Sequence, residues 1–115
     1  MTADDFEAHL KGLGLKVETI TGADGGRYIA VMAFTIPTGG LAGQTCDLAI
    51  RREESVPYMP PAAIHTRPAL VAMGSLNTQQ SPIGPDWQYW SRRFDHPPTP
   101  ARLWAHILTV FTEVA

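Results

Sequence analysis

The chain has 115 residues, of which 44% are hydrophobic and 17% are charged, and its formal net charge is -2. This length favours one domain over residues 1–115, because two units of half the size would each bury too little apolar surface. The near-neutral charge and the absence of a long basic stretch argue against nucleic-acid binding. No apolar run is long enough to span a membrane, so we expect neither of these partners.

The cysteine and histidine content limits the chemistry further. Cys46 is the only cysteine, so an intramolecular disulfide is impossible, as is typical of proteins from a reducing cytoplasm. The first eleven residues include acidic side chains and lack the apolar run of a secretory signal, so we expect a cytoplasmic location. The four histidines, at 9, 65, 96 and 106, lack metal-ligand spacing. No phosphate-binding loop pattern is present, so we expect no metal and no cofactor.

The N-terminal segment predicts a helix followed by strands. Thr2 can cap a helix on which Phe6, Leu10 and Leu13 share one face. Glycine-rich turns and alternating or apolar runs come next. We expect strands over residues 15–20, 28–36 and 44–50. In the last of these, alternation places Cys46 with Leu48 and Ile50 on one side.

The middle of the chain is rich in proline. Residues 56–61 contain three prolines, which lack amide donors and restrict the residues before them, so this segment is expected to be an extended, rigid crossing. A fourth strand is expected from residues 62–66 and 69–73, interrupted at Pro68. Residues 74–85 are rich in Gly, Ser, Asn, Gln and Pro and predict a long loop or flap.

The C-terminal segment predicts helical structure. Trp87 and Trp90 are expected to share one side of a short helical turn over residues 86–93. Thr99 and Pro100 then form a good helix start, and an amphipathic stripe follows to the end of the chain. The whole pattern predicts an α+β fold: an N-terminal helix, a four-stranded antiparallel meander, a proline-rich crossing and flap, and a C-terminal helix.

Three stretches of the sequence carry a family resemblance. They are Tyr58-Met59-Pro60-Pro61 after the third predicted strand, residues 36–50, and the string Trp87-Gln88-Tyr89-Trp90-Ser91-Arg92-Arg93 with the helix that contains His106. The chain resembles the prokaryotic E2/UBC-fold superfamily, the variant called E2 family protein E. This resemblance implies a UBC-like fold and a role in a bacterial ubiquitin-like conjugation pathway. It also implies a ubiquitin-like protein and an activating enzyme as partners.

The resemblance departs from an E2 at the nucleophile. An E2 accepts the modifier on a cysteine that follows the proline-rich crossing, and this chain has none there. Cys46 precedes the crossing and is expected to be a small buried hydrophobe. Thr78 and Ser81 are the weak candidates for a hydroxyl nucleophile, with solvent-facing loop residues as the simpler interpretation. His65 lies where E2 proteins carry a His-Pro-Asn motif, but the asparagine is not matched, and Asn77 is the nearest substitute.

The remaining candidates are a base and a contact surface. His96, beside Asp95, is a weak candidate for an acid-oriented base, and a structural turn is the alternative. A partner surface could include seven residues: Tyr58, Pro60, Pro61, Trp87, Trp90, Arg92 and Arg93. For the two tryptophans the simpler interpretation is that they anchor the core, and for the two arginines that they are solvated charges.

Three functions remain open at this point. The first is an atypical or catalytically inactive E2-like component that binds a ubiquitin-like modifier or its activating enzyme. The second is an active transferase that uses a hydroxyl, or a cysteine of a partner, in place of its own thiol. The third is a small protein-interaction module with no link to conjugation.

Overall fold

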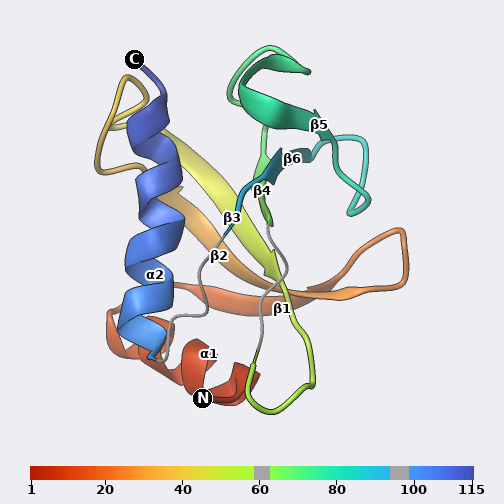
Figure 1. The fold of residues 1–115 in the computed structure, drawn as a ribbon, viewed down its shortest axis with the longest axis vertical. Coiled ribbons are helices and arrows are strands. Elements are labelled where there is room, and N and C mark those ends of the chain that lie inside the picture. Colours follow the sequence, from red (N-terminus) through yellow and green to blue (C-terminus); the bar gives the residue numbers. More distant parts are fainter. Residues whose placement is uncertain (59–62, 94–98) are drawn as a thin grey trace.

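The computed structural model describes residues 1–58, 63–93 and 99–115. These residues form two α-helices and a six-stranded antiparallel sheet with strand order β1-β2-β3-β4-β6-β5 (Figure 1). The helices are α1 (Ala3–Gly12) and α2 (Pro100–Thr109). The strands are β1 (Val17–Thr21), β2 (Arg27–Thr35), β3 (Thr45–Arg51), β4 (Ala63–Arg67), β5 (Thr78–Gln80) and β6 (Gln88–Ser91). Within the described part of the chain, neither helix has the length and apolar character needed to cross a bilayer.

The predicted α+β class is confirmed, and the first four strands form the expected antiparallel meander. Two further strands, β6 and β5, extend the sheet beyond β4, so the expectation of four strands was too low. Residues 69–73 do not continue the fourth strand, which ends at Arg67, directly before Pro68. A proline there cannot donate to the ladder, which explains where pairing stops.

The N-terminal helix begins as the sequence predicts. Thr2 and Asp5 form a reciprocal capping box, in which the Thr2 hydroxyl accepts from the Asp5 amide and the Asp5 carboxylate accepts from the Thr2 amide. Phe6 and Leu10 are buried against the sheet. Leu13, expected on the same face, is 52% exposed, because it lies at the C-cap just beyond the last helical residue.

The segment 86–93 contains strand β6 (Gln88–Ser91), and the predicted helical turn is wrong. In a strand, side chains three residues apart point to opposite faces, whereas in a helix they share one. Trp90 packs in the core beneath the helices, and Trp87 packs in a smaller cluster on the other face of the sheet. The predicted flap also holds regular structure, namely strand β5 and a 3-10 turn over Ser75–Asn77.

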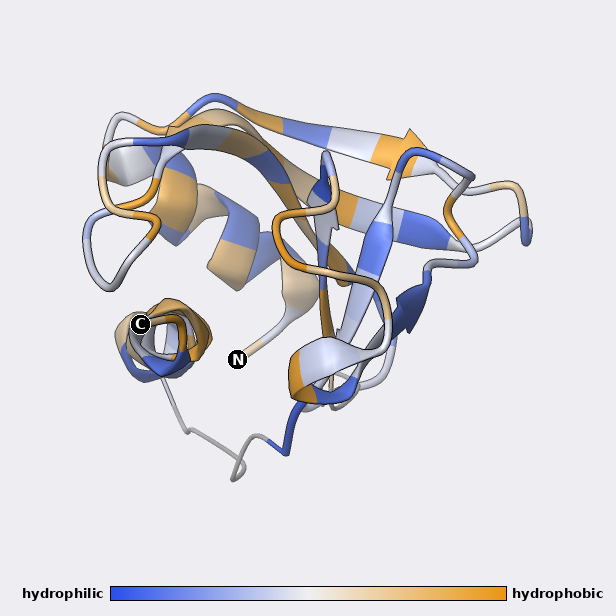
Figure 2. Ribbon diagram, turned by 90° about the horizontal axis from the view of Figure 1, so that it is seen from above, coloured by the Kyte–Doolittle hydropathy of each residue, from blue (hydrophilic) through white to orange (hydrophobic). Residues whose placement is uncertain are grey.

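Both helices lie on one side of the sheet and cover it (Figure 2). On α2, Thr99 caps the first turn with Pro100 at the first helical position, and Leu103 and Ile107 face the core, as predicted. A short 3-10 turn, Val110–Glu113, continues the helix and buries Phe111. The main core therefore lies between the two helices and β2, β3, β4 and β6.

Candidate functional site

A flap covers the face of the sheet that the helices leave open. We use "the flap" for residues 74–87, which include β5 and the loop that leads into β6. This loop reaches across the sheet to the β1–β2 turn, where the amides of Ala23 and Asp24 donate to the carbonyls of Ile83 and Pro82, at 2.9 and 3.3 Å. Ile83 and Trp87 pack there on Tyr28 in the second apolar cluster. The second face is therefore closed by a loop rather than by a helix.

A buried histidine and serine meet under the flap. His65 on β4 and Ser81 in the flap are 4% and 3% exposed, and the imidazole Nδ1 lies 2.8 Å from the serine Oγ. The Ser81 oxygen also accepts from the Ile83 amide at 3.1 Å. Burial lowers the pKa of His65 to about 4, so the imidazole is neutral at pH 7. In the tautomer that carries its proton on Nε2, Nδ1 accepts from the Ser81 hydroxyl, and the serine oxygen accepts from the Ile83 amide.

Aromatic rings enclose this pair. Tyr28 and Tyr89 each meet the imidazole edge-on, with ring centroids 5.1 and 5.3 Å away. The Tyr28 hydroxyl donates to a carboxylate oxygen of Asp24 at 2.8 Å, and burial, with this carboxylate, raises the pKa of Tyr28 to about 12. Local sequence patterns could not predict that a histidine lies beside Ser81, because His65 lies on β4 and Ser81 lies in the loop after β5.

His65 and Ser81 have the functional groups of a base and a nucleophile, but a substrate cannot reach them in this conformation. A nucleophile must reach its substrate, and Ser81 is buried with both of its hydrogen-bonding roles in use. Both interactions hold the flap onto the sheet. The pair is therefore a buried polar contact with a structural role.

Thr78, the other hydroxyl candidate, is also a structural residue in this fold. It is 5% exposed and starts β5. Its Oγ1 donates to the Ser75 carbonyl at 2.7 Å and accepts from the Gly74 amide and the Gln88 side chain, each at 3.2 Å. The hydroxyl is thus fully engaged in shaping the turn before β5.

The single thiol lies deep in the core. Cys46 is 4% exposed and points with Leu48 and Ile50 into the cluster beneath the helices, on the side that alternation predicts. Burial, with a smaller contribution from the Asp47 carboxylate, raises the pKa of Cys46 to about 12. A thiol in this position is protonated and shielded, so it cannot act as a nucleophile in this conformation.

Three of the residues proposed for a contact surface are buried. Tyr58, Trp87 and Trp90 are 3%, 4% and 0% exposed. The Trp90 indole donates to the Thr66 hydroxyl at 2.9 Å, and the Arg67 guanidinium stacks 4.7 Å above the Trp87 ring. A direct contact between these rings and a partner is therefore not possible in this conformation, and their role is to anchor the core.

The remaining surface candidates divide between described and undescribed parts of the chain. Arg93 is exposed, whereas Arg92 is mostly buried against Trp90 and paired with Glu113. Pro60, Pro61 and His96 lie outside the described residues. Among the described residues, no group of three or more His, Cys, Asp or Glu side chains is arranged to hold a metal ion.

Sequence reasoning missed Gln88, which organises the loop before the flap. Its side chain is 0% exposed. The amide oxygen accepts from the Leu70 amide at 2.8 Å, and the amide nitrogen donates to the Val71 carbonyl at 3.0 Å and to the Thr78 hydroxyl. The sequence shows Gln88 as a polar residue next to Trp87. Its buried, hydrogen-bonding role can be inferred only once β6 is recognised as a strand.

On the flap and directly before it, apolar and polar groups are exposed together. Met73 and Leu76 are 49% and 41% exposed. Leu76 and Asn77 have positive φ values of 52° and 56°, a conformation that side chains other than glycine seldom adopt. Next to them, a surface groove is lined by Gly74, Asn77, Thr78, Gln79, Tyr89 and Ser91.

Comparisons with known proteins gave no match: no protein-family model, no curated protein and no solved structure is significantly similar to this chain.

Proposed function

We propose that the protein is an E2-like component of a bacterial ubiquitin-like conjugation pathway that binds the modifier or its activating enzyme without forming a thioester. The position of Cys46 is the observation that supports binding without a thioester. It is the only thiol of the chain, it is 4% exposed, and burial raises its pKa to about 12. A thioester with a bulky modifier needs a thiol that is accessible and readily deprotonated.

The order of helices and strands supports the proposal that the protein is E2-like. The N-terminal helix, the four-stranded meander and the C-terminal helix come in the order that the resemblance implies, and β5 and β6 are additional to it. Two aromatic residues of the strings that carry the resemblance lie in the core: Tyr58 packs on Phe6 of α1, and Trp90 packs on Phe111 next to α2. These contacts support a shared scaffold and say nothing of activity.

The outer side of the flap is the surface we assign to the partner. Met73 and Leu76 offer exposed apolar contacts, and the adjoining groove offers the side chains of Asn77, Gln79 and Tyr89. Leu76 and Asn77 have positive φ values, and the Leu76 side chain is exposed on the flap. An apolar contact beside neutral hydrogen-bonding groups suits a protein surface or an extended polypeptide tail.

The competing functions receive less support from the geometry. A hydroxyl transferase would need an accessible Ser81 or Thr78, and both are buried and hydrogen-bonded. If a partner chain supplied the cysteine that is missing here, this chain would be the subunit that binds the partner. That alternative agrees with the proposal. An interaction module unrelated to conjugation would use the same flap surface but a different partner.

The experiment is a binding measurement with any ubiquitin-like protein and any activating enzyme that are encoded near this gene. Isothermal titration calorimetry with the wild-type chain is expected to show a complex with one of them. Leu76→Asn should weaken it at least tenfold, because asparagine accepts the positive φ while removing the apolar contact. Leu13→Asn is the matched control, since Leu13 is similarly exposed but lies beyond α1. Equal affinities for the two variants would refute the assigned surface, and no binding to either neighbour would refute the function.

A further inference from the structure

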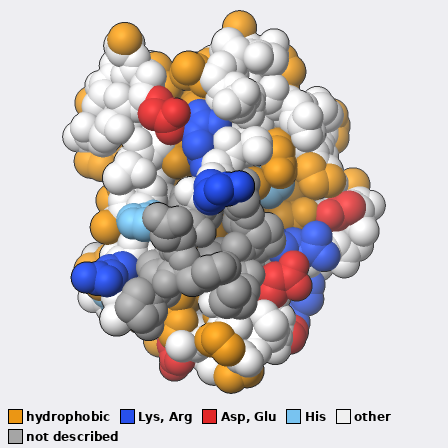
Figure 3. Space-filling view, in the orientation of Figure 1, with side chains coloured by type: hydrophobic (Ala, Val, Ile, Leu, Met, Phe, Trp, Pro, Cys, Tyr) orange, Lys and Arg blue, Asp and Glu red, His pale blue; other side chains and the backbone are white. Residues whose placement is uncertain are grey.

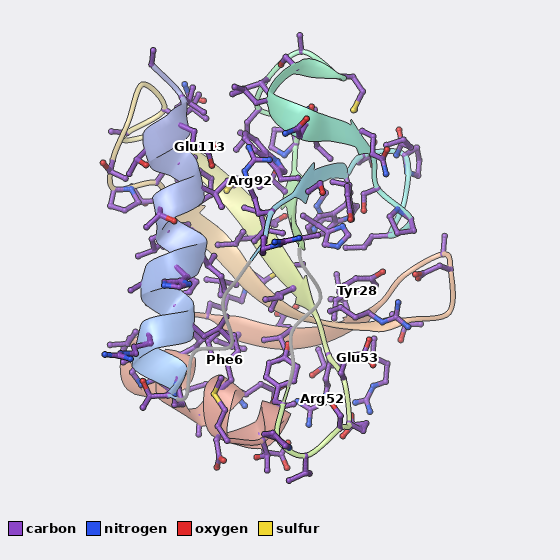
Figure 4. The ribbon with its side chains drawn as sticks, viewed as in Figure 1. Phe6, Tyr28, Arg52, Glu53, Arg92 and Glu113 are labelled. Atoms are coloured by element: carbon purple, nitrogen blue, oxygen red, sulfur yellow. The ribbon has the colours of Figure 1, made fainter. Side chains whose placement is uncertain are left out.

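A second candidate site lies away from the flap groove, between the end of β6 and the C-terminal helix. A groove there is lined by Arg92, Arg93, His106, Thr109, Val110 and Glu113. Arg92, which follows β6, and Glu113, in the 3-10 turn after α2, meet at this groove (Figure 4). Basic side chains gather in the middle of this face of the molecule (Figure 3).

Arg92 is held in a fixed orientation. Its guanidinium lies 5.6 Å above the Trp90 ring, and its side chain is 11% exposed. Nε donates to the Glu113 carboxylate at 2.8 Å, and Nη1 donates to the Ser91 carbonyl at 2.6 Å. Stacking and two hydrogen bonds together leave the guanidinium plane little freedom, so the remaining N–H groups point in a set direction.

One donor of this group has no partner. Nη2 of Arg92 is buried and makes no hydrogen bond to the described residues. A buried charged donor without an acceptor costs free energy, so an unpaired one in a folded protein calls for an explanation. An acceptor that enters from the groove lined by Arg92 and Arg93 would satisfy it.

The charges around the groove favour an anion. Arg93 is exposed at the same groove and adds a second guanidinium, while Glu113 neutralises one of the two. The two arginines and one glutamate leave an excess of one positive charge, with the imidazole of His106 and the side chain of Thr109 beside it. Two guanidinium groups, one of them rigid, form the arrangement that binds carboxylate or phosphate oxygens in pairs.

We propose that this groove binds a single oxyanion group, a carboxylate or a phosphate, through the free Nη2 of Arg92 and the guanidinium of Arg93. Val110, which is buried, closes the floor of the groove. The site is separate from the surface assigned to the partner on the flap. The anion-site proposal can therefore be tested independently of the proposed function.

The test uses the full chain and two small probes, inorganic phosphate and acetate, at constant ionic strength. Two-dimensional NMR that includes the arginine Nε–H signals follows each titration. Saturable shifts are expected at Arg92, Arg93 and the neighbouring residues of α2. Binding of phosphate alone would identify a phosphate site, and binding of acetate as well would identify a site that also takes carboxylates. Shifts that are absent, unsaturable or spread evenly over the surface would overturn the proposal.

Variants separate anion binding from a purely structural role of the arginines. Arg93→Gln should weaken the binding of the probe about threefold or more, with no change in the urea midpoint, because the side chain is exposed. Arg27→Gln, the same change on an exposed arginine of β2, is the matched control and should leave the affinity unchanged. Glu113→Gln should strengthen binding, because it removes the competing carboxylate. If Arg93→Gln and Arg27→Gln have equal effects, or if Glu113→Gln weakens binding, the proposal is wrong.

Discussion

Replacing Ser81 with alanine tests whether the His65–Ser81 pair is structural. The hydroxyl is hydrogen-bonded to the imidazole Nδ1 at 2.8 Å and accepts from the Ile83 amide at 3.1 Å. Its removal leaves two buried groups without a partner, each at a cost of about 1–2 kcal/mol. We therefore expect the free energy of unfolding to fall by about 2–4 kcal/mol, a large part of the total stability of a domain of this size.

Urea denaturation followed by tryptophan fluorescence measures this change directly. Trp87 packs against the flap cluster, so its emission reports on the region that the serine holds. Ser91→Ala is the matched control, because Ser91 is exposed on β6, and we expect its effect to stay within about 0.5 kcal/mol. If Ser81→Ala unfolds at the wild-type urea concentration, the pair does not hold the flap, and Ser81 regains its place as a possible nucleophile.

Three further predictions concern stability. Burial lowers the pKa of His65 from 6.5 to about 4, so between these values the unfolded chain binds a proton that the folded chain does not, and stability falls as the pH falls. From pH 7 to pH 5 this amounts to about 2 kcal/mol, and urea unfolding of His65→Gln should show a correspondingly smaller pH dependence than the wild type; equal dependence would contradict the assignment. Gln88→Leu should cost about 2–4 kcal/mol and increase hydrogen exchange at the Leu70 amide, which loses its acceptor; unchanged exchange would contradict the role of Gln88. Gly39→Ala should destabilise more than Gly14→Ala in thermal unfolding, because both have positive φ but only at Gly39 would the added carbon clash with the Phe111 carbonyl; equal losses would count against this packing.

Local patterns were sufficient to predict the elements whose causes are local. The helix starts at Thr2 and Thr99 follow from capping chemistry, and the inward side of β3 follows from alternation through Cys46. The β1–β2 hairpin follows from glycines that accept positive φ, as Gly25 does. In each case the residues that determine the structure are neighbours in sequence, so pattern and structure agree.

The failures have a common cause in long-range pairing. Trp87 and Trp90 suit one face of a helix as well as the two faces of a strand, and only pairing of β6 with β4 decides between them. The contact between His65 and Ser81 depends on the same pairing and on the return of the flap to the β1–β2 turn. Neither can be inferred from a sequence window, because the partners lie far apart along the chain.

The most direct test of the account combines the chain with ATP and with any ubiquitin-like protein and activating enzyme that are encoded near its gene. Products are resolved by mass spectrometry and by electrophoresis with and without a reducing agent. We predict a noncovalent complex and no covalent adduct, in the wild type and in Cys46→Ala alike. An adduct that a reducing agent releases and that Cys46→Ala abolishes would contradict the central claim that this scaffold binds its partner without carrying a modifier.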